Sequence, residues 1–443
     1  MSISRKQFLK NTAIAMAGIG SVELLSAEPS IQSATKQSNM TQNSNLIELK
    51  NVRLETGFEY DADQIVGIKT ELFNLKIVDG KISEILKNNP SSNAIDAEGK
   101  LMLPMFKDMH IHLDKTFYSD VWNNKKRPSG GVKAMIALEQ EILPELLKTS
   151  TQRAEKLIEL LQSYGSGFAR SHVNIEPTSK LKSLENLQKA LENKKDTFTA
   201  ELVAFPQHGL YYTDSAQLMK EAAQMDIDYI GGLDPYSIDG SIEKPMDFTV
   251  QLALDYNKGI DIHLHEGGDS GLKTVEYLIK KVIENPSLKG KTYLSHCFVL
   301  GRIEKPKLES IAEQLAENQI GIMSTIPFAG FSMPIPTLIK HGVKVASGND
   351  SIIDHWDIFG SGSVLKKANL MAQLYGYRDE FGLSRCLKIA TDNLVPLQDD
   401  GKQIWPKQND EASFVLVDAI CSSEAVARVS TIKSLYHKGT KVY

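Results

Sequence analysis

The chain is short of cysteine, and this restricts how it could cross-link itself or bind a metal. Its 443 residues include three cysteines, Cys297, Cys386 and Cys421. They are too few and too scattered for a disulfide framework or a thiolate zinc site. Any metal ion must therefore be held by nitrogen and oxygen ligands.

An excess of basic residues is also missing. Lysine and arginine number 50 against 55 acidic residues, the formal net charge is -5, and aromatic residues make up 7%. No basic stripe interleaved with aromatic residues is visible, so we expect no nucleic-acid partner. The hydrophobic fraction of 42% is ample for a large core. The length suits two or three domains, or one large barrel with a small additional module.

The N-terminus lacks an apolar run long enough to span a membrane. The uncharged run from Asn11 to Val22 is shorter than the ~17 residues that a spanning helix needs. A basic start, this short run and small residues near Ala27 are typical of an export signal. The start, "SRKQFLK", resembles a twin-arginine signal with Lys6 in place of the second arginine. We expect residues 1–45 to be an export signal and a disordered linker, and the destination to be a bacterial periplasm. A frayed amphipathic helix on a cytoplasmic protein is the alternative.

Short β-like segments occur at both ends of the remaining chain. Turn dipeptides, Asp79-Gly80 and Glu98-Gly99, separate such runs within residues 46–102, and matching runs return within residues 395–443. We expect the two ends of the chain to pair in one small β-sandwich.

Between these ends, strand-like runs alternate with amphipathic helical stretches such as 150–165 and 274–286. The eight expected strands are 103–112, 167–175, 200–206, 228–235, 259–265, 291–297, 320–327 and 343–349. Strand–helix alternation predicts a parallel sheet. Eight repeats within residues 103–394 suit a (β/α)8 TIM barrel, so the predicted fold is α/β, with the β-sandwich attached to the barrel.

Histidines gather where such barrels have their active sites, at the carboxyl ends of the strands. Of the ten in the chain, those expected at this rim are His110, His112, His172, His208, His263, His265 and His296. Asp350 follows the last strand at the same rim. Residues two apart on a strand face the same way, so His110 and His112 can bind one cation, and His263 and Asp350 can add two ligands. Neutral imidazole and carboxylate suit one divalent ion, zinc or iron(II).

Two further side chains at the rim are candidates for proton transfer and charge stabilisation. Glu266 lies three residues after His263, where a carboxylate can take a proton from metal-bound water and pass it to a leaving group. Capping of the next helix is the alternative role for Glu266. His296 can orient or stabilise the attacking hydroxide, or it can be a hydrogen-bonding neighbour of the ligands.

Several motifs in combination resemble the amidohydrolase superfamily and, within it, the cytosine-deaminase-like branch. The motifs are HIHLDKT, RSHVNI, VAFPQHG, HLHE, LSHC and SGNDSIIDHW. The similarity extends from about Leu46 to the end of the chain. The metal ligands that it implies are His110, His112, His263 and Asp350. The catalytic residues that it implies are Glu266, His296 and Asp350.

The resemblance also bears on substrate binding and on the number of metal ions. Gln207, in "FPQ", matches a glutamine that contacts the substrate ring in this branch. Two-metal members of the superfamily need a bridging lysine or similar group on the third or fourth strand. Residues 200–206 and 228–235 contain no lysine. A site with one metal ion is therefore implied.

The sequence departs from true cytosine deaminases close to the expected ligands. Ser351 stands where they carry a second acidic residue that contacts the pyrimidine. Lys115 in "HLDK" and His265 look more like the N-isopropylammelide amidohydrolases. Lys115 can polarise a carbonyl on an oxo-substituted ring, or it can pair with Asp114 or another acid. Trp356 can form a wall of the pocket or serve in packing.

The resemblance implies a hydrolase that acts on C–N bonds other than peptide bonds. We expect it to deaminate a cyclic amidine such as an aminopyrimidine or aminotriazine, or to remove an alkylamine from it, through metal-bound hydroxide. The side chains expected around the ring are Gln207, Lys115, His265, Ser351 and Trp356. The alternatives are a cyclic-amide ring-opening hydrolase, a two-metal phosphotriesterase-like hydrolase and a non-catalytic binding protein. The expected partner is a small nitrogen heterocycle, and we expect no membrane span; the chain can also form homo-oligomers.

Overall fold

The computed structural model describes residues 46–122, 128–326 and 331–443. The predicted export signal and linker, residues 1–45, lie outside the described residues. Over the ranges that are described, none of the helices is both long and apolar enough to cross a membrane.

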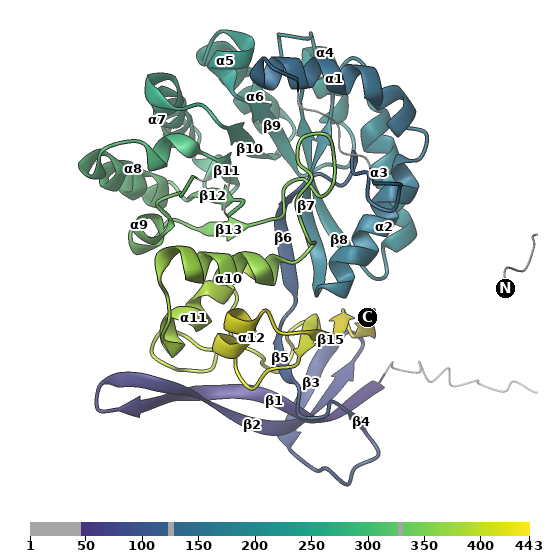
Figure 1. Ribbon diagram of the computed structural model, residues 1–443, viewed down its shortest axis with the longest axis vertical. Coiled ribbons are helices and arrows are strands. Elements are labelled where there is room, and N and C mark those ends of the chain that lie inside the picture. Colours follow the sequence, from purple (N-terminus) through teal and green to yellow (C-terminus); the bar gives the residue numbers. More distant parts are fainter. Residues whose placement is uncertain (1–45, 123–127, 327–330) are drawn as a thin grey trace, which may run out of the picture. The chain divides into compact units, whose positions relative to one another are not determined.

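Eight parallel strands form one sheet, in the order β13-β12-β11-β10-β9-β8-β7-β6. Their bounds are β6 Phe106–Ile111, β7 Ser166–Asn174, β8 Thr199–Phe205, β9 Tyr229–Leu233, β10 Gly259–Leu264, β11 Thr292–His296, β12 Ile320–Ser324 and β13 Val345–Ser347. Each strand overlaps one of the eight expected from the sequence. The predicted (β/α)8 barrel is therefore confirmed (Figure 1).

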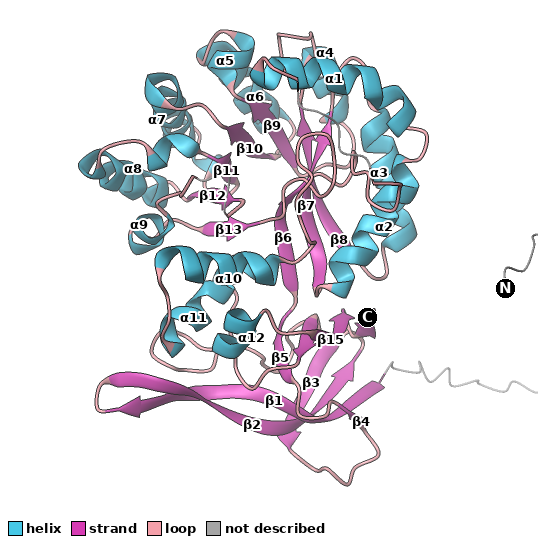
Figure 2. Cartoon of the chain, in the orientation of Figure 1, coloured by secondary structure: helices cyan, strands magenta, loops and turns pink. Residues whose placement is uncertain are grey.

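Helices surround this sheet, as Figure 2 shows. Their bounds are α1 Gly131–Leu146, α2 Ser150–Ser163, α3 Lys182–Lys194, α4 Ala216–Ala222, α5 Pro235–Asp239, α6 Glu243–Asp255, α7 Gly268–Glu284, α8 Lys305–Glu317, α9 Ile335–Lys340, α10 Val364–Tyr375, α11 Glu380–Cys386 and α12 Ser422–Arg428. Short 3-10 turns span Pro286–Leu288, Phe298–Gly301 and Leu387–Ala390. In α7, the spacing of Val275, Leu278 and Val282 places all three on one buried face, which explains why this amphipathic stretch is helical.

The second sheet is built from both ends of the described chain, in the order β16-β15-β14-β5-β1-β2-β3, with β4 paired to β1. Its bounds are β1 Leu46–Asp61, β2 Gln64–Val78, β3 Lys81–Lys87, β4 Ile95–Asp96, β5 Leu101–Pro104, β14 Phe414–Val417, β15 Ile432–His437 and β16 Thr440–Lys441. Asp79 and Gly80 turn the chain between β2 and β3 with φ angles of 49° and 77°, the left-handed region that a tight hairpin requires. The prediction that the two chain ends pair in one β module is confirmed.

The first expected barrel strand, 103–112, is in fact divided between the two sheets. β5 pairs with β14 and β1 in the second sheet, whereas β6 pairs with β7 in the barrel. Pro104 ends β5, because a proline has no N–H to continue a ladder. The chain therefore passes directly from the β module into the strand that carries the first two histidines.

The barrel closes where the end of β6 meets the segment after β13. The N–H of Asp350 donates to the carbonyl of His110 at 2.8 Å, and the N–H of His112 donates to the carbonyl of Asp350 at 3.2 Å. Gly348 permits this approach, because a Cβ at this position would lie 2.2 Å from the carbonyl oxygen of His110. The same closure brings Asp350 beside the two histidines of the first strand.

Below the rim, side chains from the strands fill the barrel. One buried cluster comprises Met109, Val203, Tyr229, Tyr293, Met323 and Ala346. Arg170 is buried between Tyr229 and Tyr293, with its guanidinium carbon 4.1 Å and 4.2 Å from the two ring centroids. The barrel is therefore a packed core, and ligands must enter at the rim.

Candidate metal centre and active site

Four side chains from four strands converge at the rim. His110 lies in β6, His263 in β10 and His296 at the end of β11, and Asp350 follows β13. One ligand atom from each lies within 4.8 Å of the others. The backbone reaches this arrangement through left-handed conformations at His296 and Asp350, both with φ of 65°. Three imidazoles and a carboxylate are a suitable donor set for zinc or iron.

His112 also reaches the same carboxylate. Its Nε2 lies 3.4 Å from Oδ1 of Asp350, the same distance as Nε2 of His110. The four ligands predicted from the sequence therefore lie together, and His296 is a fifth donor beside them, with Nε2 4.0 Å from Oδ2 of Asp350. A further imidazole, His172, has its ring centroid 4.4 Å from those of His110 and His263.

A buried hydrogen-bonded chain sets the tautomer of His110. Ser295 donates its hydroxyl proton to Oδ1 of Asp261 at 2.6 Å, and its Oγ lies 2.9 Å from Nδ1 of His110. Because the proton of Ser295 is already given to Asp261, the hydroxyl oxygen accepts the Nδ1–H of His110. Nε2 of His110 then carries a lone pair, which faces a carboxylate oxygen of Asp350. Both this nitrogen and the carboxylate oxygen are hydrogen-bond acceptors, and a cation between them would satisfy both.

Burial keeps the imidazoles neutral. Burial lowers the pKa of His112 to about 3, and it takes the pKa values of His263 and His296 well below 6.5. Both ring nitrogens of His263 are buried without a hydrogen-bond partner among the described residues. Burial alone would raise the pKa of Asp350, but the imidazoles of His110 and His112 beside it hold the pKa well below its usual range. Neutral imidazoles, among them His263 with both nitrogens unpaired within the described residues, beside an ionised carboxylate fit a divalent cation.

Glu266 lies just beyond β10 and keeps one carboxylate oxygen free. Its Oε1 accepts the N–H groups of Tyr236 and Ser237 at 2.9 Å and 2.8 Å, whereas Oε2 is buried without a partner among the described residues. These N–H groups belong to α5, so Glu266 does not cap the following helix, α7. Burial raises the pKa of Glu266, which suits a group that must both accept and release a proton near neutral pH.

Asp234, which the sequence analysis did not select, holds the loop that carries His265 and Glu266. Its Oδ1 accepts the N–H of His265 at 2.6 Å and that of Glu266 at 3.1 Å, and its Oδ2 lies 2.8 Å from Nδ1 of His265. The ring of His265 stacks on that of His296 at 4.5 Å. Burial would lower the pKa of His265, but the Asp234 carboxylate raises it. Asp234 could have been selected from the sequence, because it directly follows the fourth barrel strand, at the rim where active-site residues lie.

Lys115 and Gln207 lie together on another side of the rim. The ammonium of Lys115 donates to Oε1 of Gln207 at 2.5 Å and to Oδ1 of Asn174 at 3.4 Å, and it lies 3.9 Å from Oε1 of Glu139. The acid beside Lys115 is thus Glu139 of α1. Asp114, the acid considered from the sequence, instead accepts the N–H of Asn174. Glu139 could not be selected from the sequence, because nothing distinguishes it there from the other acidic residues of α1.

The remaining predicted residues, Ser351 and Trp356, lie in the loop that follows β13. Ser351 is buried next to Asp350. Trp356 donates its indole N–H to Oε2 of Glu139 at 3.2 Å, and its ring centroid is 5.6 Å from the ammonium of Lys115. Trp356 therefore belongs to the same wall as Lys115 and Gln207.

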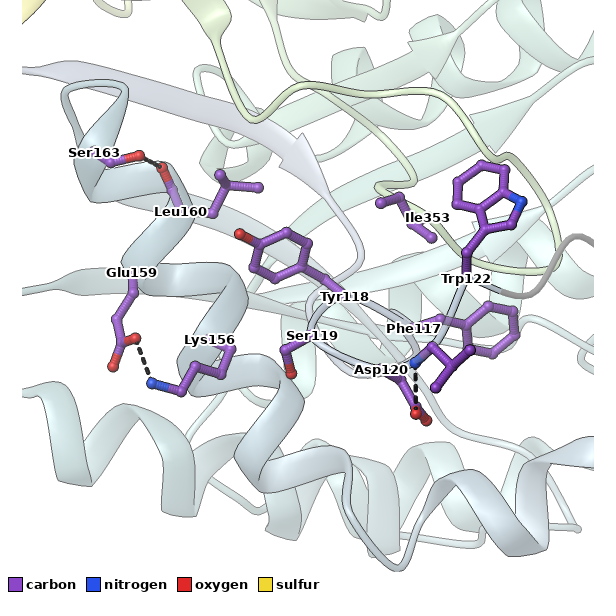
Figure 3. Close-up of a pocket in the computed structure, with 11 residues that line it drawn as sticks. Phe117, Tyr118, Ser119, Asp120, Trp122, Lys156, Glu159, Leu160, Ser163 and Ile353 are labelled. Carbon is purple, nitrogen blue, oxygen red and sulfur yellow. Dashed lines mark hydrogen bonds and ion pairs between the residues drawn. The ribbon is translucent and has the colours of Figure 1, made fainter. Parts of the chain in front are cut away.

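A cavity of about 570 Å³ lies next to this loop but does not include the donor cluster (Figure 3). Phe117, Tyr118 and Trp122 line it from the segment after β6, and Lys156 and Leu160 line it from α2. Lys156 forms an ion pair with Glu159 at 2.7 Å within the same lining. The cavity thus lies beside the site residues rather than among them.

The chain matches no family model. It is 49% identical over 400 residues to the uncharacterized protein YahJ of Escherichia coli (strain K12), covering 89% of this chain and 87% of that protein. It is 25% identical over 364 residues to the N-isopropylammelide isopropyl amidohydrolase of Pseudomonas sp. (strain ADP), covering 81% of this chain and 90% of that enzyme. Among solved structures, 5-methylcytosine deaminase from Klebsiella pneumoniae liganded with 5-fluorocytosine superposes with a TM-score of 0.75 and 24% identity. That similarity covers 90% of this chain and 97% of the deaminase.

Proposed function

Because the chain belongs to the amidohydrolase superfamily, in its cytosine-deaminase-like branch, we propose that it hydrolytically removes an amine from a cyclic amidine. The ring would be an aminopyrimidine or an aminotriazine, and the leaving group ammonia or an alkylamine. The single observation that carries the proposal is the position of Glu266, whose free Oε2 is buried at the rim that also holds the imidazole–carboxylate cluster.

We propose that this cluster holds one zinc or iron ion. The ligands would be His110, His112, His263 and Asp350, with His296 beside them. A divalent cation supplies the positive charge that lets water lose a proton near neutral pH. Neither β8 nor β9 carries a lysine that could bridge a second ion, so one ion per chain is favoured.

The proton transfers belong to Glu266 and Asp350. We propose that Oε2 of Glu266 accepts a proton from the attacking water and delivers it to the departing nitrogen, while the water oxygen bonds to the ring carbon and the C–N bond breaks. Asp350 assists in removing the water proton. His296, next to Asp350, stabilises the negative charge that develops on the oxygen added to the ring carbon in the tetrahedral intermediate. Gln207 and His265 would hold the ring from either side.

The test is amine release from a panel of aminopyrimidines, aminotriazines and oxo-purines by metal-loaded protein. The variant Glu266→Gln should retain the metal and lose at least about 1,000-fold in kcat, since the proton carrier is lost. Glu276→Gln is the control: it changes a partly exposed carboxylate on α7 that pairs with Lys307 at 2.6 Å, and it should turn over substrate as wild type does. Full turnover by the Glu266→Gln protein would remove the role of Glu266. A ring-opened product without free amine would support the cyclic-amide hydrolase instead.

We also propose that the protein is exported through the twin-arginine-like signal at its N-terminus. The support is the basic start, the short apolar run and the small residues near Ala27. N-terminal sequencing of the mature protein from its host should find a start after Ala27. A mature protein that retains Met1 and remains in the cytoplasm would contradict export.

A further inference from the structure

A single buried carboxylate joins four segments of the barrel mouth. Glu139 of α1 is fully buried, and its two oxygens accept hydrogen bonds from three side chains. The donors are Nδ2 of Asn174 at 2.9 Å, Nε2 of His208 at 3.1 Å and Nε1 of Trp356 at 3.2 Å. Oε1 also lies 3.3 Å from Nε2 of His355 and 3.9 Å from the ammonium of Lys115. An ionised carboxylate without solvent is stable here because cations and donors surround it.

The charges around Glu139 balance within the buried network. His208 lies between two carboxylates, with Nε2 3.1 Å from Glu139 and Nδ1 3.2 Å from Glu176. Burial would lower the pKa of His208, but hydrogen bonds to Glu139 and Glu176 raise it to about 9. Imidazolium His208 and the ammonium of Lys115 therefore offset the negative charges of Glu139 and Glu176. Removing the charge of Glu139 would remove the carboxylate that lies 3.9 Å from the ammonium of Lys115.

Lys115 in turn determines how Gln207 is oriented. An ammonium group can donate hydrogen bonds but cannot accept them, so the atom of Gln207 at 2.5 Å must be the carbonyl oxygen. The amide nitrogen, Nε2, then points elsewhere, and it makes no hydrogen bond with any described residue. Gln207 therefore has two N–H donors left for a ligand.

The ring of Phe205 connects Lys115, the partner of Gln207, with the imidazoles of the donor cluster. Phe205, two residues before Gln207, stacks its ring on that of His263 at 4.1 Å. The ammonium of Lys115 lies 6.0 Å from the centroid of the Phe205 ring, and Lys115 itself follows His112 by three residues. One aromatic ring thus separates the Glu139 network from the donor cluster.

We propose that Glu139 is a positioning residue for substrate specificity: it holds Lys115 against Gln207, so that Gln207 turns N–H donors toward the ring. The inference rests on the proposed function and narrows its substrate class. The accepted rings carry an oxo oxygen, a hydrogen-bond acceptor, on the edge that faces Gln207. A ring with an N–H or amino donor on that edge would leave a buried donor facing a donor and would be rejected.

The experiment compares Glu139→Gln with Glu141→Gln, which changes an exposed carboxylate on the same helix. Each protein is assayed on an oxo ring and its analogue without the oxo group, cytosine with 4-aminopyrimidine and ammeline with melamine. For Glu139→Gln we expect kcat/KM on the oxo ring to fall about 10- to 100-fold, mainly through KM, as for the loss of one or two hydrogen bonds to the ligand. On the analogue, kcat/KM should fall less than about 3-fold. The ratio of kcat/KM on the oxo ring to that on the analogue therefore decreases. Metal content should not change, and Glu141→Gln should match wild type.

Equal losses on both rings, or no loss on either, would overturn the proposal. If Glu139→Gln does not fold, Lys115→Met tests the same contact. It should also decrease the ratio of kcat/KM on the oxo ring to that on the analogue. Crystal structures of wild type and Glu139→Gln give a readout that does not depend on turnover. The contact between Lys115 and Oε1 of Gln207 should be lost only in the variant, and an unchanged contact would refute the role of Glu139. If wild type releases no amine from any ring, the proposed function fails, whereas the structural comparison still decides the role of Glu139.

Discussion

Ser295 offers a test of how the barrel would prepare His110 to bind a metal ion. The variant Ser295→Ala removes the hydroxyl that joins Asp261 to Nδ1 of His110. It leaves a buried carboxylate oxygen and a buried imidazole N–H unsatisfied, which costs about 1–3 kcal/mol of folding free energy. His110 can then rotate or adopt the other tautomer, so its Nε2 lone pair is no longer held toward Asp350. Loss of such an orienting partner typically lowers metal affinity about 10- to 100-fold.

The assay is a metal titration against a competing chelator, with thermal unfolding measured in parallel. Thr292→Val is the matched control, because it removes a buried hydroxyl from the same strand, β11, that donates only to the carbonyl of Leu288 at 3.0 Å. Both variants should lose some stability, but only Ser295→Ala should lose metal affinity. Equal metal dissociation constants for the two variants would refute the argument that Ser295 prepares His110.

Two other predictions concern stability. Gly348→Ala should destabilise the barrel by about 1–3 kcal/mol or more, because the new Cβ would lie 2.2 Å from the carbonyl oxygen of His110. Gly57→Ala, where a new Cβ would lie 3.8 Å from its nearest neighbour, the carbonyl oxygen of Gly401, should change the melting temperature little. Similar melting temperatures for the two variants would contradict the close approach at Gly348. His208 has its pKa raised to about 9, above the ordinary 6.5, so the stability it contributes is fully present below pH 6.5 and is lost as pH rises through about 9. The expected loss is on the order of 3 kcal/mol, and thermal unfolding between pH 6 and 10 should show a steeper decline for wild type than for His208→Gln. Parallel profiles would mean that His208 is not an imidazolium in the folded protein.

Much of the fold could be predicted from the sequence, because strand and helix periodicities alternate so regularly. The clustering of His110, His112, His263 and Asp350 could be predicted for a related reason, since parallel strands of a barrel all end at one rim. The division of the first strand at Pro104 could not, because β5 and β6 follow one another as a single strand-like stretch and only their pairing partners distinguish them.

The residues that support the site could not be predicted from sequence patterns. Glu139 lies on a helix with several acidic residues, and nothing local shows that its side chain alone is buried. Ser295 contacts His110, and Asp261 contacts Ser295, only because of the register between β10 and β11 and the closure of the barrel. The approach of His296 to Asp350 depends on left-handed backbone at both residues, which no spacing rule anticipates. Side-chain networks of this kind are determined by tertiary geometry rather than by local sequence.

In the proposed function, one divalent ion and Glu266 together remove an amine from an intact ring by adding water. The most direct measurement is mass spectrometry of the product formed in 18O-labelled water, with metal-loaded and chelator-stripped protein compared at equal concentration. We expect free amine and a ring-intact product that carries one labelled oxygen, formed only by protein that contains one equivalent of metal. A ring-opened product, or equal turnover after the metal has been removed, would contradict it.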